Sequence, residues 1–309
     1  MSDTLPKRKY ILAGGSGFLG TALARILLAR GDEPVILTRN PAHWRGPGRA
    51  VAWDGKTAGP WAAELDGAAA IINLTGRTVD CRKTPANKRV ILESRVNSVH
   101  ALAAAWAQVK NPPKVWIQSA TAHIHGDTAD ELIDESSPIG TGFAPEVGMA
   151  WEKSLADAAL PGCRQVVLRI SFVLGATGGA LPVLARLTRL FMGGTLGSGR
   201  QYFSWLHVDD LNAIILRALD DDTMSGVYVT TAPGPVTNRD FMAELRRALH
   251  RPFGLPTPEP LLRIGAWFLR TDPELPLLGR RLVPTRLMRE GFVFKHPALL
   301  EALRDLLGK

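Results

Sequence analysis

Apolar residues occur along the first half of the chain in short runs, each followed by a segment with helical periodicity. The runs are rich in β-branched residues and bounded by glycine or charged residues, as buried strands are. In TALARILLARGD, residues 21–32, apolar positions recur every three or four residues and Gly31 is a stop signal. The strand-like runs cover residues 9–15, 33–39, 50–53, 68–76, 114–120 and 164–175. This alternation predicts a Rossmann-type α/β fold, a doubly wound parallel sheet covered by helices on both faces.

The pattern changes after about residue 176, where helical segments dominate and prolines punctuate them. An amphipathic basic helix over residues 181–194 either lies on a membrane surface or packs on its own protein, and we expect the second. A late strand over residues 226–232 returns to the sheet. The predicted division is a nucleotide-binding domain, residues 1–175 completed by about 205–232, and a smaller, mostly helical substrate-side domain, residues 176–204 and 233–309.

A glycine-rich turn, GGSGFLG at residues 14–20, lies between the first strand and the first helix. Glycines permit a tight turn, close approach of a pyrophosphate and close packing of helix on strand, while the helix N-terminus faces the phosphates. Strand, turn, helix and second strand occur in the order that a dinucleotide site requires. The predicted cofactor contacts in this turn are Gly14, Ser16, Gly17, Phe18 and Leu19.

Arg39 ends the second strand, at the position where NAD-preferring sites carry a carboxylate that accepts bonds from the ribose hydroxyls. A guanidinium cannot accept those bonds, but it pairs with a 2′-phosphate. The residue therefore favours NADP(H) as the cofactor, with Asn40 assisting at the same phosphate. The alternative is that Arg39 is a solvated residue at a strand end.

Composition narrows the classes of partner and compartment. The chain has no apolar run of about 18 residues and no signal-peptide pattern, and its two cysteines, Cys81 and Cys163, belong to no metal-spaced cluster. We expect a cytoplasmic protein without a metal site or a membrane partner. The net charge of +8 raises a nucleic-acid hypothesis, but the basic residues are dispersed and no nucleic-acid motif is present, so we expect no nucleic-acid partner.

Several strings make the chain resemble the extended, epimerase/dehydratase-type branch of the short-chain dehydrogenase/reductase superfamily. More narrowly, it resembles an atypical, poorly characterised subgroup of epimerase-like proteins that share a helical C-terminal segment. The strings are GGSGFLG, INLTG, ILESRV, SAT, AWEKSLA, LRISFVLG, GSGRQYFSWLHVDDL, VTNRDFMAELRRALHRP and VPTRLMREGFVF.

The resemblance implies further cofactor contacts at the ends of later strands. The loop after the fourth strand would pass the ribose and phosphates, the end of the fifth strand would lie beside the nicotinamide, and the segment after the sixth would flank its ribose. The matching residues are Asn73, Leu74, Thr75, Gly76, Ser119, Ala120, Arg169 and Ser171.

The superfamily's proton-transferring tyrosine is absent. Active members carry a tyrosine four residues before a lysine on one helix face, whereas this chain has Met149 before Lys153. A thioether exchanges no proton. The subgroup carries a Trp-Glu pair here, as at Trp151 and Glu152, so Lys153 either contacts the nicotinamide ribose or matches by accident, and Trp151 is expected beside the cofactor.

Two histidines stand where the subgroup has an aromatic pair. His123 and His125 are candidate proton donors, and we favour His125, with Ser119 or Thr121 orienting the substrate. The alternative is that they are ordinary loop histidines. The predicted catalytic residues are Ser119, His125 and Lys153.

The string GSGRQYFSWLHVDDL offers substrate contacts in a glycine-rich loop. Arg200, Gln201 and Tyr202 are the candidates, because arginine suits an anionic substrate group. Asp209 or Asp210 is expected to cap the following helix and to join the two domains. A homodimer through the helices at about residues 88–108 and 146–160 is implied by the resemblance.

We therefore expect an NADP(H)-dependent oxidoreductase or epimerase that acts on a small, anionic substrate with a non-standard proton donor. The missing tyrosine favours the alternative, a non-catalytic NADP(H)-binding sensor or scaffold protein.

Overall fold

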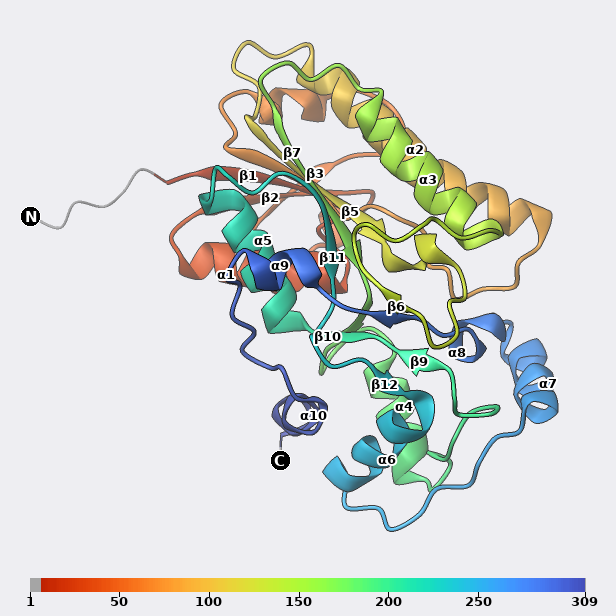
Figure 1. The fold of residues 1–309 in the computed structure, drawn as a ribbon. Helices are drawn as coiled ribbons and strands as arrows, with labels where there is room; N and C mark the ends of the chain where they lie inside the picture. The colour runs from red at the N-terminus through yellow and green to blue at the C-terminus, as the bar shows by residue number, and fades with distance from the viewer. Residues whose placement is uncertain (1–6, 309) are drawn as a thin grey trace, which may run out of the picture.

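The computed structural model describes residues 7–308, and its centre is a seven-stranded parallel sheet (Figure 1). The strand order is β11-β7-β5-β4-β1-β2-β3. The chain adds strands on one side of β1 as far as β3 and then crosses to the other side of β1 at β4, so the topological switch point lies between β1 and β4. The strands are β1 (Lys9–Ala13), β2 (Glu33–Thr38), β3 (Arg49–Ala52), β4 (Ala70–Asn73), β5 (Val115–Thr121), β7 (Arg164–Ile170) and β11 (Gly226–Thr230). The predicted doubly wound Rossmann-type fold is confirmed.

Two pairs of helices cover the two faces of this sheet (Figure 1). The helices α1 (Phe18–Ala29) and α5 (Val208–Asp220) pack on one face, and α2 (Pro85–Trp106) and α3 (Phe143–Ala156) on the other. Alternate strand residues divide between the two cores: Leu12 and Ile36 face α1 and α5, while Ile11 and Val35 face α2 and α3. Burial on both faces explains why the strands read as continuous apolar runs.

The predicted sixth strand, residues 164–175, is two strands in the structure. β7 ends at Ile170, and the chain leaves the main sheet to form β8 (Phe172–Leu174), which pairs with β10 (Trp205–His207). Two further small sheets join β9 (Tyr202–Phe203) to β12 (Val236–Thr237) and β13 (Arg281–Leu282) to β6 (Leu132–Ile133). Strands from both predicted domains thus pair with one another, and the domain boundary at residues 175–176 stays a prediction.

The remaining helices form the mostly helical C-terminal region. They are α4 (Leu181–Arg189), α6 (Asn238–Ala248), α7 (Glu259–Leu269), α8 (Glu274–Leu277), α9 (Thr285–Arg289) and α10 (Leu299–Leu307). Short 3₁₀ turns occur at Pro41–His43, Pro60–Leu65 and Ala122–His125. Across residues 7–308, no helix has the length and apolar character needed to cross a membrane.

The capping of α5 corrects one expectation. His207, not Asp209 or Asp210, caps the helix, because its Nδ1 accepts the N–H of Asp209 at 3.0 Å. Asp210 is fully buried, and its carboxylate accepts the backbone N–H groups of Lys295 and His296 at 2.7 and 3.0 Å. Asp210 lies inside the first turn of α5 and not at its N-cap, and its carboxylate holds the C-terminal segment on α5.

Candidate dinucleotide and substrate site

The glycine-rich turn between β1 and α1 is too tightly packed for larger residues at two positions. Gly14 has φ +71°, and an added Cβ would lie 2.9 Å from the Cα of Thr75. At Gly20 an added Cβ would lie 2.4 Å from the Cα of Gly15, so that α1 rests directly on the turn. These glycines bring the N-terminus of α1 to the carboxyl ends of β1 and β4.

The N-terminus of α1 has donors available for an anion. Gly17 is its N-cap and offers no side chain, and the N–H groups of Phe18 and Leu19 have no backbone acceptor in residues 7–308. An added Cβ at Gly17 would meet only the carbonyl oxygen of Gly14, at 3.4 Å, so this side of the turn is open. Ser16 accepts the hydroxyl of Thr38 at 3.1 Å, which ties the turn to β2.

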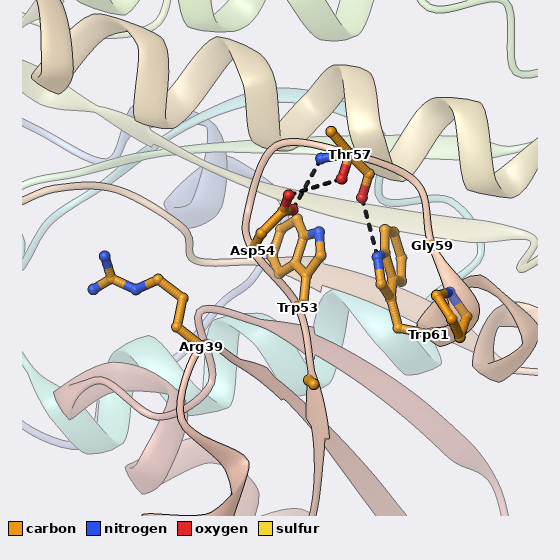
Figure 2. A pocket seen from close by; sticks show the side chains of 8 residues that line it. Arg39, Trp53, Asp54, Thr57, Gly59 and Trp61 are labelled. Carbon is orange, nitrogen blue, oxygen red and sulfur yellow. Dashed lines mark hydrogen bonds between the residues drawn. The ribbon is translucent and has the colours of Figure 1, made fainter.

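Arg39 lies on an open pocket of about 410 Å³ beside the end of β2 (Figure 2). Its exposed guanidinium has neither a hydrogen bond nor an ion pair with any described residue. Trp53 and Trp61 line the pocket, and the carboxylate of Asp54 is held by the N–H and hydroxyl of Thr57 at 2.9 and 2.7 Å. Asn40 is also exposed at this edge.

The loop after β4 divides into a structural and an accessible part. Asn73 is fully buried, and its side chain bonds Ser98, Gln118 and the N–H of Thr75 at 3.3, 3.1 and 3.1 Å. Its amide therefore has little capacity left for a ligand. The hydroxyl of Thr75 is buried without a hydrogen-bond partner among residues 7–308, and Leu74 packs against the glycine turn.

The ends of β5 and β7 add two unpaired hydroxyl groups. Ser119 is half-buried at the end of β5 beside Ala120, and its hydroxyl makes no hydrogen bond within the described part of the chain. Ser171 follows β7 and has a buried hydroxyl that likewise has no partner there. Buried polar groups are normally paired, so unpaired ones at this edge indicate a place for ligand atoms.

A buried ion pair joins α3 to β7 below this edge. The guanidinium of Arg169 is 7% exposed and bonds both carboxylate oxygens of Glu152, at 2.8 and 2.9 Å. Its remaining amino group lies 3.3 Å from Nε2 of His125. Arg169 therefore orients Glu152 and His125 with three of its five N–H donors, and its contact with the cofactor ribose stays a prediction.

His125 has both ring nitrogens engaged. Nδ1 lies 3.0 Å from the carbonyl oxygen of Pro138, which can only accept, and Arg169 can only donate to Nε2. The ring is therefore the neutral Nδ1–H tautomer, and burial, with the charge of Arg169, lowers its pKa. This geometry gives no support to His125 as a proton donor, because a transfer would break one of the two contacts.

His123 has a different environment. Its ring is partly accessible and makes no hydrogen bond to any described residue. Burial and the charges of Arg280 and Lys83 lower its pKa to about 3, so the imidazole is neutral at physiological pH.

The residues of α3 separate into a buried and an exposed set. Trp151 is 4% exposed and lies under the guanidinium of Arg95, whose Cζ is 4.9 Å from the ring centre. Met149 is 41% exposed, and Lys153 makes an exposed ion pair with Asp157 at 2.8 Å. The structure does not bring Lys153 together with the other predicted catalytic residues, and its ribose contact stays a prediction.

The predicted substrate residues also separate. Arg200 is exposed and its guanidinium has no partner among the described residues. The side-chain amide of Gln201 donates to the carbonyls of Leu196 and Pro276, both at 2.9 Å, so it holds the loop to the C-terminal region. Tyr202 lies in β9 under the guanidinium of Arg281.

Sequence reasoning missed several residues at this site. Arg280, which is 7% exposed and lies beside His123, was not among the predicted residues. Trp53 and Asp54 line the Arg39 pocket, and the strand-to-loop boundary after residue 52 was the only signal for them. The Glu152–Arg169 pair joins residues 17 positions apart, which no local pattern reveals.

An adenine dinucleotide fits these features. The open glycine turn and the unbonded N–H groups of α1 suit a pyrophosphate, the pocket at Arg39 suits the adenosine, and Thr75, Ser119 and Ser171 offer unpaired hydroxyls toward the nicotinamide half.

Comparison with known proteins identifies the family. Residues 10–229 match the NAD dependent epimerase/dehydratase family, and residues 257–306 match a domain of unknown function, DUF1731. The human epimerase family protein SDR39U1 is 33% identical over 306 residues, covering 97% of this chain and 100% of that protein. A homologue from Arabidopsis thaliana, described as chloroplastic, is 32% identical over 96% of this chain and 86% of its own length.

A crystal structure of human SDR39U1 (isoform 2) with NADPH superposes with a TM-score of 0.87 at 31% identity, over 97% of this chain and 99% of that one. Because the Arabidopsis relative is described as chloroplastic, the cytoplasmic location of this protein stays a prediction. The resemblance seen in the sequence is confirmed: the chain belongs to the NAD dependent epimerase/dehydratase family, the extended short-chain dehydrogenase/reductases, with a C-terminal DUF1731 domain.

Proposed function

We propose that this protein is an NADP(H)-dependent oxidoreductase or epimerase that acts on a small anionic molecule. The observation that carries the choice of NADP(H) is Arg39, an exposed and unpaired guanidinium on the pocket that suits the adenosine. A 2′-phosphate gives this cation the bidentate partner that it lacks within the described chain. The NADPH in the structure of the human relative supports the same choice.

At the reaction end, a bound nicotinamide would supply or accept a hydride. The chain's own residues hold the substrate beside it. Ser119 presents an unpaired hydroxyl at the end of β5, and the neutral ring of His123 presents an unpaired N–H. Both are donors suited to a carbonyl oxygen of the substrate. Glu152 and Arg169 fix the turn that carries the histidines through His125.

A second candidate function is NADP(H) binding without turnover, as in a sensor or scaffold protein. Met149 exchanges no proton, and both nitrogens of His125 are already engaged. This alternative shares the cofactor site and differs only in the absence of chemistry at the end of β5.

The test is a fluorescence titration with NADPH and with NADH on the wild type and on Arg39→Ala. We expect Arg39→Ala to weaken NADPH about ten- to a hundredfold, the effect of one charge-assisted hydrogen-bonded pair, and to leave NADH unchanged. Arg45→Ala is the matched control, because Arg45 is an exposed arginine nearby that bonds the carbonyls of Ala42 and Trp44. Equal loss of both nucleotides in Arg39→Ala would contradict the assignment to NADP(H).

Oxidation of bound NADPH, followed with a panel of small aldehydes and ketones that carry a carboxylate or phosphate, then separates the two candidates. Turnover by the wild type that falls in Ser119→Ala would support the first candidate, the enzyme. If Ser119→Ala binds NADPH as tightly as the wild type does, its lower turnover reflects a slower reaction and not weaker cofactor binding.

A further inference from the structure

Arg280 lies in the C-terminal region immediately before β13 and is fixed by its backbone. Its N–H donates to the carbonyl of Tyr202 at 3.1 Å, and its carbonyl accepts the hydroxyl of Ser204 at 2.7 Å. β13 continues from it and pairs with β6. The backbone position is therefore held from two sides, and the side chain is 7% exposed.

The guanidinium of Arg280 has no directly bonded counter-ion in the described part of the chain. Within residues 7–308 it makes no hydrogen bond and no ion pair, and its Nε is buried without a partner. Burial lowers its pKa to about 10, so it is still protonated at neutral pH. Arg169 is also 7% exposed, but its guanidinium bonds both carboxylate oxygens of Glu152. A buried and unpaired charge is strongly unfavourable, so its persistence indicates a partner outside the chain.

No acidic side chain within residues 7–308 makes an ion pair with Arg280. Asp127, whose charge reaches Arg280, accepts the N–H of Gly279 at 3.2 Å. Asp272 pairs with Lys83 at 2.7 Å. The carboxylate of Asp127 acts on Arg280 from a distance, and the guanidinium is left without a directly bonded anion among the described residues.

The position of Arg280 relative to the end of β5 follows from two contacts of its neighbour Gly279. The N–H of Gly279 donates to the carboxylate of Asp127 at 3.2 Å, and the carbonyl of Gly279 accepts the N–H of Thr128 at 3.2 Å, so Arg280 lies beside the segment that directly follows the turn of the two histidines. The charge of Arg280 lowers the pKa of His123 and of His125, which agrees with this position. That turn continues directly from Ser119 and Ala120, the residues expected beside the nicotinamide. Arg280 therefore lies where the far end of a small substrate would extend from the nicotinamide toward the C-terminal region.

We propose that Arg280 binds the negatively charged oxygen group, a carboxylate or phosphate, of the substrate held beside the nicotinamide. The planar guanidinium suits two oxygens of such a group at once. This inference rests on the proposed function and assigns the anion to Arg280 in place of the exposed Arg200. The substrate class is then a small carbonyl or hydroxyl compound that carries one carboxylate or phosphate group at its far end.

The experiment measures binding of inorganic phosphate and of acetate to the protein saturated with NADP⁺, at constant ionic strength set with chloride. Saturation fills the turn at α1 and Arg39, the other anion-binding positions of the site. Binding is read from the rise in the midpoint of thermal unfolding and from calorimetry. The phosphate and acetate arms distinguish the two kinds of anionic group.

We expect Arg280→Met to weaken binding of the preferred anion at least tenfold and Arg200→Met to change it less than twofold. We also expect Arg280→Met to unfold at a higher temperature than the wild type without added anion, because it removes an unpaired buried charge. Arg280→Gln replaces it if the methionine variant does not fold.

Three outcomes would overturn the inference. In the first, neither phosphate nor acetate binds the NADP⁺ complex. In the second, Arg280→Met binds the anion as tightly as the wild type does. In the third, Arg200→Met abolishes anion binding instead. NADPH affinity is measured on the same samples. Failure to bind NADPH would overturn the proposed function and this inference with it, whereas normal NADPH affinity without an anion effect would overturn this inference alone.

Discussion

The two ends of the site differ in how their polar groups are satisfied. At the adenosine end, the first N–H groups of α1 and the guanidinium of Arg39 have no partner in the described chain. Beneath the reaction end, Glu152, Arg169 and His125 satisfy one another. At the first end only a ligand would complete the polar groups, while at the second the unpaired hydroxyls of Ser119 and Ser171 lie above a polar foundation, an ion pair that is formed without a ligand. The predictions below test this contrast.

The largest effect is expected at the foundation. Glu152→Ala leaves Arg169 buried without its carboxylate, and we expect a loss of about 3 kcal/mol in the free energy of unfolding. Denaturant unfolding followed by circular dichroism measures it. In the double variant Glu152→Ala/Arg169→Met the unpaired charge is gone, so most of the loss should be recovered. If the double variant is no more stable than Glu152→Ala, the unpaired charge of Arg169 is not the cause of the lost stability.

A nearly equal effect, on binding and not on stability, is expected at the other end. Gly17→Asp adds a carboxylate at the N-cap of α1, where an added Cβ meets only one atom, at 3.4 Å. The carboxylate accepts the N–H groups of the first turn, stabilises the helix and competes with a phosphate for them. We expect NADPH affinity to fall about a hundredfold, or about 2.7 kcal/mol, with an unchanged or higher unfolding midpoint.

The control for that variant is Gly17→Ala, which adds no charge and should bind NADPH much more tightly than Gly17→Asp. Equal affinities of the two variants would mean that the donors at α1 do not face the phosphates.

A smaller effect is expected from His123 as a function of pH. Its pKa is about 3 in the folded protein and about 6.5 in the unfolded chain, so between these values the unfolded state binds more protons. Stability that is present above pH 6.5 is therefore lost progressively as the pH falls toward 3. In His123→Asn the unfolding midpoint should fall less steeply between about pH 6.5 and 4 than in the wild type. The exposed His250, changed to asparagine, should keep the wild-type slope.

The same contrast explains what the sequence could and could not predict. The sheet, the glycine turn and Arg39 depend on local periodicity and on a motif of seven residues, and their placement followed from the chain alone. The cap at His207 was missed because Asp210 is committed to a segment 85 residues away. The pairing of Arg169 with Glu152 was missed because no local pattern connects residues 17 positions apart, and Arg280 was passed over because only the structure shows that it is buried without a partner.

The smallest effect is expected at Lys153, the neighbour of Glu152 on α3. Its ion pair with Asp157 at 2.8 Å joins two exposed side chains, and such pairs contribute about 0.5 kcal/mol or less. We expect Lys153→Ala to change neither the unfolding midpoint nor NADPH affinity measurably, although it stands one residue from the variant with the largest effect. A tenfold loss of NADPH affinity would instead show that the lysine turns toward the nicotinamide ribose when the cofactor binds. The reaction end would then be remodelled by its ligand, and its polar foundation would be less complete than the buried Glu152–Arg169 pair indicates.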